Sequence, residues 1–232
     1  MSDDPFGQAG FQCRLEWGLD GLRRLAAVAD VVVVVDVLRF TTCVDVVVSR
    51  GGSVVPHRWT GPSDSPATAD LSPVALSRVR RGDVVELPSP NGATLSIEGA
   101  AWGAAVLAGC LRNASAVGRA AARLAGDGVV AVVPAGERWG EPPGRLRVAV
   151  EDLLGAGAVL VAAARESCSP EARAAMETFG SAAGDLDGWL GACGSGRELV
   201  ARGLGADVEM AARLDVSEAV PVLRDTAFVP LQ

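Results

Sequence analysis

The sequence contains no lysine and no tyrosine, and its only histidine is His57. Without lysine the chain cannot form a Walker A phosphate loop, a Schiff base or a lysine general base. Phosphohistidine chemistry that needs a second imidazole is excluded by the single histidine. A serine–histidine triad would have to use His57, and the chain has no G-x-S-x-G elbow. These absences exclude several of the common routes to hydrolysis.

Cysteine chemistry is also disfavoured. The five cysteines are odd in number, are scattered and form no C-x-x-C pair. This usage indicates thiols in a reducing cytoplasm rather than a disulfide framework or a zinc site. Cys193 and Arg197 are separated by three residues, whereas the cysteine-phosphatase loop has five, so that loop is excluded. The sequence therefore predicts a cytoplasmic protein.

Charge and hydropathy exclude two classes of partner. The net charge is −7 at pH 7, which argues against a nucleic acid or an anionic membrane as partner. The N-terminal residues lack the basic and apolar regions of a signal peptide, and the most apolar stretch, residues 153–164, is too short to span a bilayer. We expect no nucleic-acid or membrane partner, whereas a homodimer is compatible with strands of this apolar type.

Strand-like and helix-like segments alternate through the first two-thirds of the chain. This alternation predicts an α/β fold, a three-layer α/β/α sandwich with a largely parallel or mixed sheet and a helix-rich C-terminal third. We expect one domain over residues 1–232, with a sheet-forming part at 1–147 and a helical part at 148–232. The predicted strands are 11–17, 31–36, 53–58, 83–87, 104–108 and 129–133. The predicted helices are 18–28, 41–50, a short one from Ser72, 93–99, 114–125, 148–164, 170–179, 185–192 and 195–204. Residues 59–71 form a predicted loop, and 220–223 with 227–229 a closing hairpin or edge pair.

Polar residues follow four of the predicted strands. Residues 31–35 are all valine, as in a strand buried on both faces, and Asp36 follows them directly. If the sheet is parallel, these strand ends share one edge, where α/β proteins bind ligands. Carboxylates there suit Mg²⁺, while arginine, amides and hydroxyls suit phosphate oxygens. The residues concerned are Asp36, Arg39, Thr41 and Thr42; Asn91, Gly92 and Thr94; Asn113 and Ser115; and Glu137.

Each of these groups also has a purely structural interpretation. Asn91-Gly92 is a strong turn dipeptide, and Asn113 and Ser115 suit helix caps. Glu151 and Asp152 begin a predicted helix, where the helix dipole alone favours acids. Adjacent helical residues point about 100° apart, so at most one of these two acids can bind a given ion. The occurrence of all four groups at one edge favours a single site.

The order and spacing of several segments resemble the 2-phosphosulfolactate phosphatase family, over residues 28–229. The resemblance implies an α/β fold and a Mg²⁺-dependent acid phosphatase that converts 2-phospho-3-sulfolactate to 3-sulfolactate, on the route to coenzyme M. The segments are Asp36-Val-Leu-Arg39-Phe-Thr-Thr42, Asn91-Gly92-Ala93-Thr94, Asn113-Ala-Ser115, Ala135-Gly136-Glu137, Glu151-Asp152-Leu-Leu-Gly-Ala-Gly157-Ala, Ser195-Gly196-Arg197-Glu-Leu and Asp215-x-Ser217 with Pro221 and Asp225.

On the positions that match the family motifs, the chemistry of the side chains suggests roles toward a small anionic phosphorylated metabolite. The expected catalytic residues are Asp36, Arg39 and Glu137. The expected phosphate or sulfonate ligands are Thr41, Thr42, Asn91, Gly92, Thr94, Asn113, Ser115 and Arg197. The expected Mg²⁺ ligands are Asp36 and Glu137 with Glu151 or Asp152.

Two other hypotheses stay open, one of them because of a departure from the family pattern. The family carries a Gly-Glu-Arg loop and a Gly-Asn-Ser-Pro segment, but here residues 59–73 are shorter and retain only Leu71-Ser72-Pro73. The chain could therefore be a non-catalytic paralogue that binds an anionic metabolite. It could also be a haloacid-dehalogenase-type phosphatase with Asp36 as nucleophile, although Leu38 stands where that class has its helper acid and no lysine is present.

Overall fold

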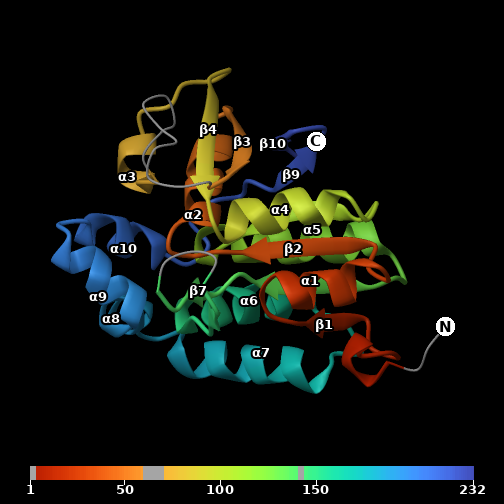
Figure 1. The fold of residues 1–232 in the computed structure, drawn as a ribbon. Helices are drawn as coiled ribbons and strands as arrows, with labels where there is room; N and C mark the ends of the chain where they lie inside the picture. Colours follow the sequence, from red (N-terminus) through yellow and green to blue (C-terminus); the bar gives the residue numbers. More distant parts are fainter. Residues whose placement is uncertain (1–3, 60–70, 141–143) are drawn as a thin grey trace.

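A mixed β-sheet runs through the middle of the molecule (Figure 1). The structure, a computed structural model, describes residues 4–59, 71–140 and 144–232. The strand order is β1-β6-β2-β5-β9-β10-β3-β4, and β7 with β8 forms a separate ribbon. The strands are β1 (Cys13–Leu15), β2 (Val31–Val35), β3 (Ser53–Arg58), β4 (Val84–Ser89), β5 (Ala105–Gly109), β6 (Val130–Pro134), β7 (Glu137–Arg138), β8 (Leu146–Arg147), β9 (Pro221–Arg224) and β10 (Ala227–Pro230).

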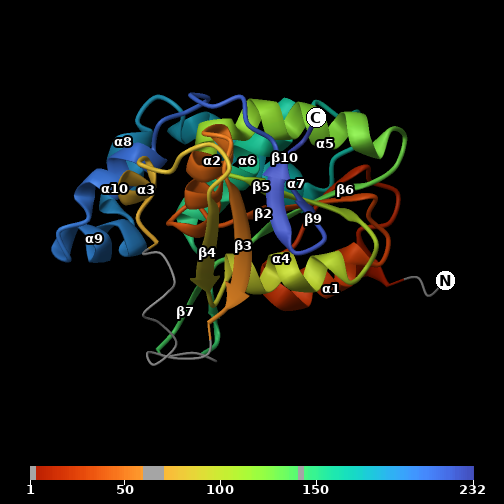
Figure 2. The same ribbon diagram turned by 90° about the horizontal axis from the view of Figure 1, so that it is seen from above.

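The valine strand β2 lies inside this sheet, between β6 and β5, because its side chains fill the cores on both faces. Val31, Val33 and Val35 pack on one side, and the intervening valines pack on the other. Figure 2 shows α5, α6 and α7 over one face and α1 and α4 over the other. The helices are α1 (Gly18–Ala26), α2 (Phe40–Ser49), α3 (Pro73–Leu76), α4 (Gly92–Ala100), α5 (Ala114–Ala125), α6 (Val150–Ala163), α7 (Pro170–Ala182), α8 (Leu186–Ala192), α9 (Gly194–Ala201) and α10 (Gly205–Ala211), with 3-10 turns at η1 (Pro5–Gly7) and η2 (Leu111–Asn113).

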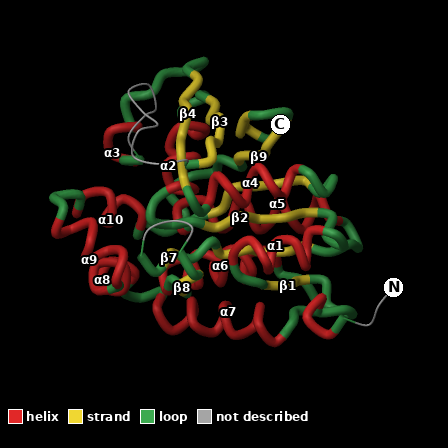
Figure 3. Tube along the Cα trace, in the orientation of Figure 1, coloured by secondary structure: helices red, strands yellow, loops and turns green. Residues whose placement is uncertain are grey.

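This arrangement confirms the predicted α/β sandwich with a mixed sheet, and the tube in Figure 3 shows the helix-rich C-terminal part. The predicted closing hairpin is β9–β10, which turns at Asp225 with a positive φ of 54°. It lies between β5 and β3, so the edge position was wrong and the sheet takes strands from both parts of the chain. The predicted loop at 59–71 falls mostly outside the described residues.

The expectation of one shared parallel edge was wrong for β4. Strands β6, β2 and β5 are parallel, but β9, β10 and β3 each pair antiparallel with the preceding strand in the sheet order. β4, which is parallel to β3, therefore runs against β2. In Figure 1, β4 descends toward the carboxyl end of β2 instead of lying alongside it. The twist of the sheet brings the two ends together from different directions.

The helical region contains more elements than the sequence indicated. The single helix predicted over 195–204 is shorter, because the chain turns at Gly203, with a φ of 79°, and then enters α10. The two-residue strands β7 and β8 were not predicted, since ribbons this short leave no periodicity to read. In the described ranges, no helix combines the length and the apolar character needed to cross a membrane.

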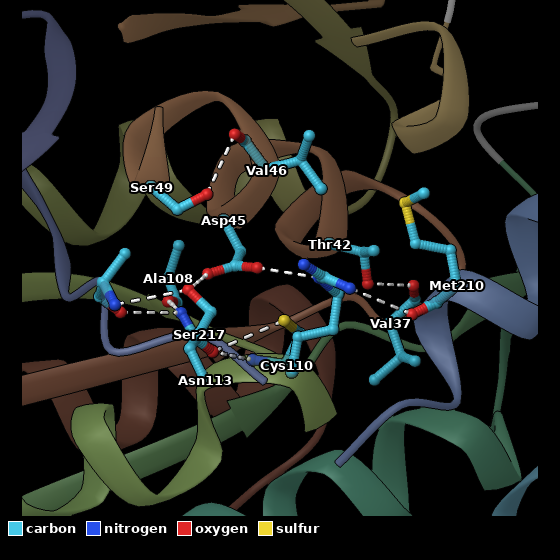
Figure 4. Close-up of polar contacts among 12 residues, drawn as sticks. Val37, Thr42, Asp45, Val46, Ser49, Ala108, Cys110, Asn113, Met210 and Ser217 are labelled. Carbon is cyan, nitrogen blue, oxygen red and sulfur yellow. Dashed lines mark hydrogen bonds and ion pairs between the residues drawn. The ribbon is translucent and has the colours of Figure 1, made fainter. Parts of the chain in front are cut away.

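A buried polar network fixes the segment after α10 against α2 and β5 (Figure 4). The Asp45 carboxylate is fully buried and accepts hydrogen bonds from Arg112 Nε at 2.8 Å and from Ser217 Oγ at 2.5 Å. Asn113 Nδ2 donates to the carbonyl oxygens of Ala108 and Ala219, at 3.3 and 3.2 Å. Two of these contacts, Ser217 with Asp45 and Asn113 with Ala219, join residues more than 100 positions apart.

We predict that Asp45→Ala destabilises the fold by about 3–5 kcal/mol, because the guanidinium of Arg112 then stays buried without its carboxylate. Glu218→Ala is the matched control, since its ion pair with Arg119 is exposed and should contribute less than about 1 kcal/mol. Urea unfolding measures both variants. Equal free energies of unfolding for the two would contradict a structural role for Asp45.

Candidate active site

Asp36 lies at the carboxyl end of β2, in a turn that two threonines lock. The Thr41 hydroxyl donates to the Asp36 carbonyl oxygen at 2.8 Å and lies 2.9 Å from the Asp36 amide nitrogen, which donates to it. The Thr42 hydroxyl donates to the carbonyl oxygen of Val37 at 2.7 Å. Both threonines are fully buried. Their hydroxyls therefore shape the turn and are not presented to a ligand.

The Asp36 carboxylate is held by amides from two helix starts. Oδ1 accepts the backbone N–H of Phe40 at 3.1 Å, and Oδ2 accepts that of Gly92 at 2.9 Å. The Ser89 hydroxyl lies 3.4 Å from Oδ2 and donates to it. A Cβ on Gly92 would lie 2.7 Å from Oδ2, so only glycine allows α4 to begin this close to the carboxylate. The Asn91-Gly92 turn is thus both structural and part of the site.

The charge on Asp36 is poorly compensated. The pKa of its carboxyl group is raised to about 6: burial raises it most, the amides of Phe40 and Gly92 lower it, and the nearby Glu137 carboxylate also raises it. Within the described residues no arginine or histidine forms an ion pair with Asp36. A proton or a bound cation would therefore stabilise this position.

The Asp152 carboxylate holds the turn that follows β2. Its Oδ1 accepts the backbone N–H of Val37 at 2.7 Å, and its Oδ2 accepts that of Gly136 at 2.9 Å. This carboxylate therefore joins the ends of β2 and β6. Burial raises the pKa of Asp152 well above its ordinary value, and the charges of Asp36 and Glu151 add to the shift. The structure places Asp152 as a brace for the segments that carry Asp36 and Glu137.

Glu137 is positioned by the Asn91 side chain. Asn91 Nδ2 donates to Glu137 Oε1 at 3.1 Å, and Asn91 Oδ1 accepts from Arg138 Nε at the same distance. The amide of Arg138 also donates to Glu137 Oε1, at 2.8 Å. The polar segments that follow β4 and β6 therefore meet, as the sequence predicted, although the two strands approach from different directions.

Arg39 is held by an acid that the sequence analysis missed. Arg39 Nη1 lies 2.6 Å from Asp207 Oδ2, and both side chains are almost completely buried. The other oxygen of Asp207 accepts from the Ser72 hydroxyl at 2.7 Å and from the amide of Val74 at 3.2 Å. No local pattern marks Asp207, because its partner is 168 positions away in the chain.

Asp36, Arg39 and Glu137 contribute to a polar cavity of about 150 Å³, which α9 also borders. Asn91 lines it as well, together with residues of α9. Its size suits a small metabolite rather than a larger cofactor. The described residues that line it are Asp36, Leu38, Arg39, Phe40, Leu71, Ser89, Pro90, Asn91, Glu137, Ser195, Glu198, Leu199 and Arg202.

The structure does not bring the other predicted ligands into this cavity. The Asn113 side chain forms hydrogen bonds with backbone groups (Figure 4). Ser115 donates hydrogen bonds to the Asp215 carboxylate from both its amide and its hydroxyl. The Thr94 hydroxyl lies 3.4 Å from the Ser89 carbonyl oxygen, to which it donates, and Arg197 is exposed on α9. Glu151 is buried beside the Cys193 thiol, away from the cavity lining.

The carboxylates do not form a ready-made metal cage. In the parts of the chain that the structure describes, no three His, Cys, Asp or Glu side chains converge on a point where an ion could bind. Asp36 and Glu137 remain as two acids facing one cavity. Mg²⁺ is commonly held by one or two carboxylates, with water and substrate oxygens as the remaining ligands. The donor set therefore fits Mg²⁺ better than it fits a metal that needs an all-protein site.

We predict that the metal-free protein loses stability as the pH rises from about 4 through about 6. The folded state binds a proton at Asp36 more tightly than the unfolded chain does, so ionisation costs up to roughly 3 kcal/mol. Urea unfolding in EDTA at several pH values measures this. In the Asp36→Asn variant the free energy of unfolding should fall less over this pH range. An identical pH dependence in the variant would contradict the raised pKa.

Comparison with known protein families identifies the family of this chain. The family model described as 2-phosphosulpholactate phosphatase matches residues 67–226, which is more than half of the chain. The match contains Asn91, Glu137 and all of α9, and it confirms the resemblance found from the motifs. The chain therefore belongs to the 2-phosphosulpholactate phosphatase family and is a phosphatase that acts on a phosphate monoester.

Proposed function

We propose that the protein hydrolyses a small anionic phosphomonoester with the help of Mg²⁺, and that this ester is 2-phospho-3-sulfolactate, which yields 3-sulfolactate and phosphate. The observation that carries the proposal is the pair of carboxylates, Asp36 and Glu137, facing a small cavity that Arg39 also lines. The family name supports the substrate. A reducing cytoplasm suits the five cysteines, all described and none in a disulfide.

Asp36 and Glu137 would hold the Mg²⁺ ion. When bound, the ion supplies charge stabilisation to the phosphoryl oxygens and orients a water molecule. The same binding would offset the burial of the Asp36 charge, which the amides of Phe40 and Gly92 offset only in part. Asn91 keeps Glu137 turned toward the cavity, and Asp152 keeps the two segments in register.

Arg39 would bind a phosphoryl oxygen. Its Nη1 is anchored on Asp207, which fixes the direction of the guanidinium within the cavity. The planar group can offer its remaining N–H donors to an anion. Because Asp207 is itself held by Ser72 and Val74, this arrangement also couples α10 and α3 to the site.

A phosphate-release assay separates this proposal from its two rivals. Small phosphomonoesters, including 2-phosphosulfolactate and 2-phospholactate, are tested with Mg²⁺ and with EDTA. EDTA-sensitive release is expected. Folded protein that binds the esters but releases nothing would indicate the binding paralogue, and a trapped aspartyl phosphate on Asp36 would indicate haloacid-dehalogenase-type chemistry.

We predict that Asp36→Asn lowers Mg²⁺-dependent phosphate release by roughly 100-fold or more, because a neutral amide cannot hold the cation or the charge at the reaction centre. Circular dichroism checks that the variant is folded. Asp187→Asn is the control, since Asp187 is an exposed acid of α8 outside the cavity lining and should leave the rate unchanged. Turnover of Asp36→Asn at the wild-type rate would remove Asp36 from the site.

A further inference from the structure

One face of α9 forms a wall of the cavity that contains Asp36. Ser195, Glu198, Leu199 and Arg202 line this wall, and their spacing of three, four and seven residues places them on one side of the helix. Seven residues correspond to about 10 Å along a helix, so the wall extends along the cavity. Gly196 lets the start of α9 pack closely against α8, since a Cβ there would lie 1.8 Å from the carbonyl oxygen of Leu190.

The Ser195 hydroxyl on this wall has no partner. Ser195 is 9% exposed, and its Oγ makes no hydrogen bond to any described residue. Leaving a buried polar group unpaired costs about 1–3 kcal/mol, so buried hydroxyls almost always have an acceptor or a donor. Because Ser195 lines the cavity, a ligand bound there is placed to supply the missing acceptor.

Positive groups accompany this hydroxyl. The start of α9 carries the positive end of the helix dipole, which favours anions. Arg202 lies at the end of the helix, 3.5 Å from the Glu198 carboxylate in an exposed pair of the kind that contributes little. Its guanidinium can therefore exchange this partner for an anionic ligand. The acids that would hold the cation, Asp36 and Glu137, also line the cavity but come from the segments that follow β2 and β6.

We propose that this face of α9 determines specificity: Ser195 donates a hydrogen bond to the sulfonate group of the substrate, and Arg202 pairs with it, while the phosphoryl group lies toward Asp36. The inference deepens the proposed function and rests on it for the identity of the ester. In this assignment α9 binds the sulfonate of the substrate, which takes no part in bond cleavage. Ser195 and Arg202 therefore contribute to substrate affinity and not to the reaction centre.

Calorimetry tests this assignment without turnover. The dissociation constants of 3-sulfolactate, isethionate (sulfonate only) and lactate (carboxylate only) are measured for the full chain. Ser195→Ala and Arg202→Gln should each weaken binding of 3-sulfolactate and isethionate by about 10-fold and leave lactate unaffected. Ser195→Thr keeps the hydroxyl and should restore affinity.

Two exposed residues outside the wall supply matched controls. Ser181→Ala removes an α7 hydroxyl that donates to the backbone carbonyl oxygen of Glu177, and Arg123→Gln removes a charge from α5. Neither should change any of the constants. The proposal is overturned if wild-type protein does not bind 3-sulfolactate, if Ser195→Ala and Arg202→Gln bind it as wild type does, or if only lactate binding weakens.

Kinetics distinguish failure of this proposal from failure of the proposed function. Ser195→Ala should raise KM for 2-phosphosulfolactate with little change in kcat, and leave both parameters unchanged for phenyl phosphate, which has no second acid. Equal effects on both esters would overturn the role in specificity while the phosphatase stands. Absence of phosphate release from every ester, together with Ser195-dependent binding of 3-sulfolactate, would instead refute the phosphatase and leave the binding wall intact.

Discussion

The burial of one carboxylate, that of Asp36, is the constraint on which the site depends. A run of valines places it at the end of a central strand, where water has little access. Two backbone amides and a hydroxyl, rather than an arginine, donate hydrogen bonds to this carboxylate. Its negative charge is therefore held in position but not neutralised. An acid in this state has a strong preference for a proton or a cation, and phosphoryl transfer can use the cation.

The surrounding structure fixes the groups that face this carboxylate. Asp152 joins the ends of β2 and β6, and Asn91 brings the end of β4 to Glu137. Asp207 anchors Arg39 and thereby links the C-terminal helices to the sheet. The result is a small cavity lined by Asp36, Arg39 and Glu137 from segments that follow strands and by Ser195, Glu198 and Arg202 from the region of α9.

The sequence predicted most of the fold because its signals are local. Five valines, the Ala-rich helices and the Asn91-Gly92 turn each specify their own segment, and the limits of β3 and α5 agree with the prediction. The direction of β4 was not predictable, since it depends on the insertion of β9–β10 between β5 and β3. Asp36, Asn91 and Glu137 were found from strand ends, whereas Asp207 and Ser195 matter only through contacts between distant segments.

The most direct test of the central claim is to locate the cation. Crystals soaked in Mn²⁺, a substitute for Mg²⁺ with an anomalous signal, would show where a divalent ion binds. The account predicts a peak in the cavity, within bonding distance of the carboxylates of Asp36 and Glu137, roughly 2.0–2.3 Å for a hard cation and oxygen ligands. A cavity without a peak at saturating Mn²⁺, or a peak bound only by residues elsewhere, would contradict it.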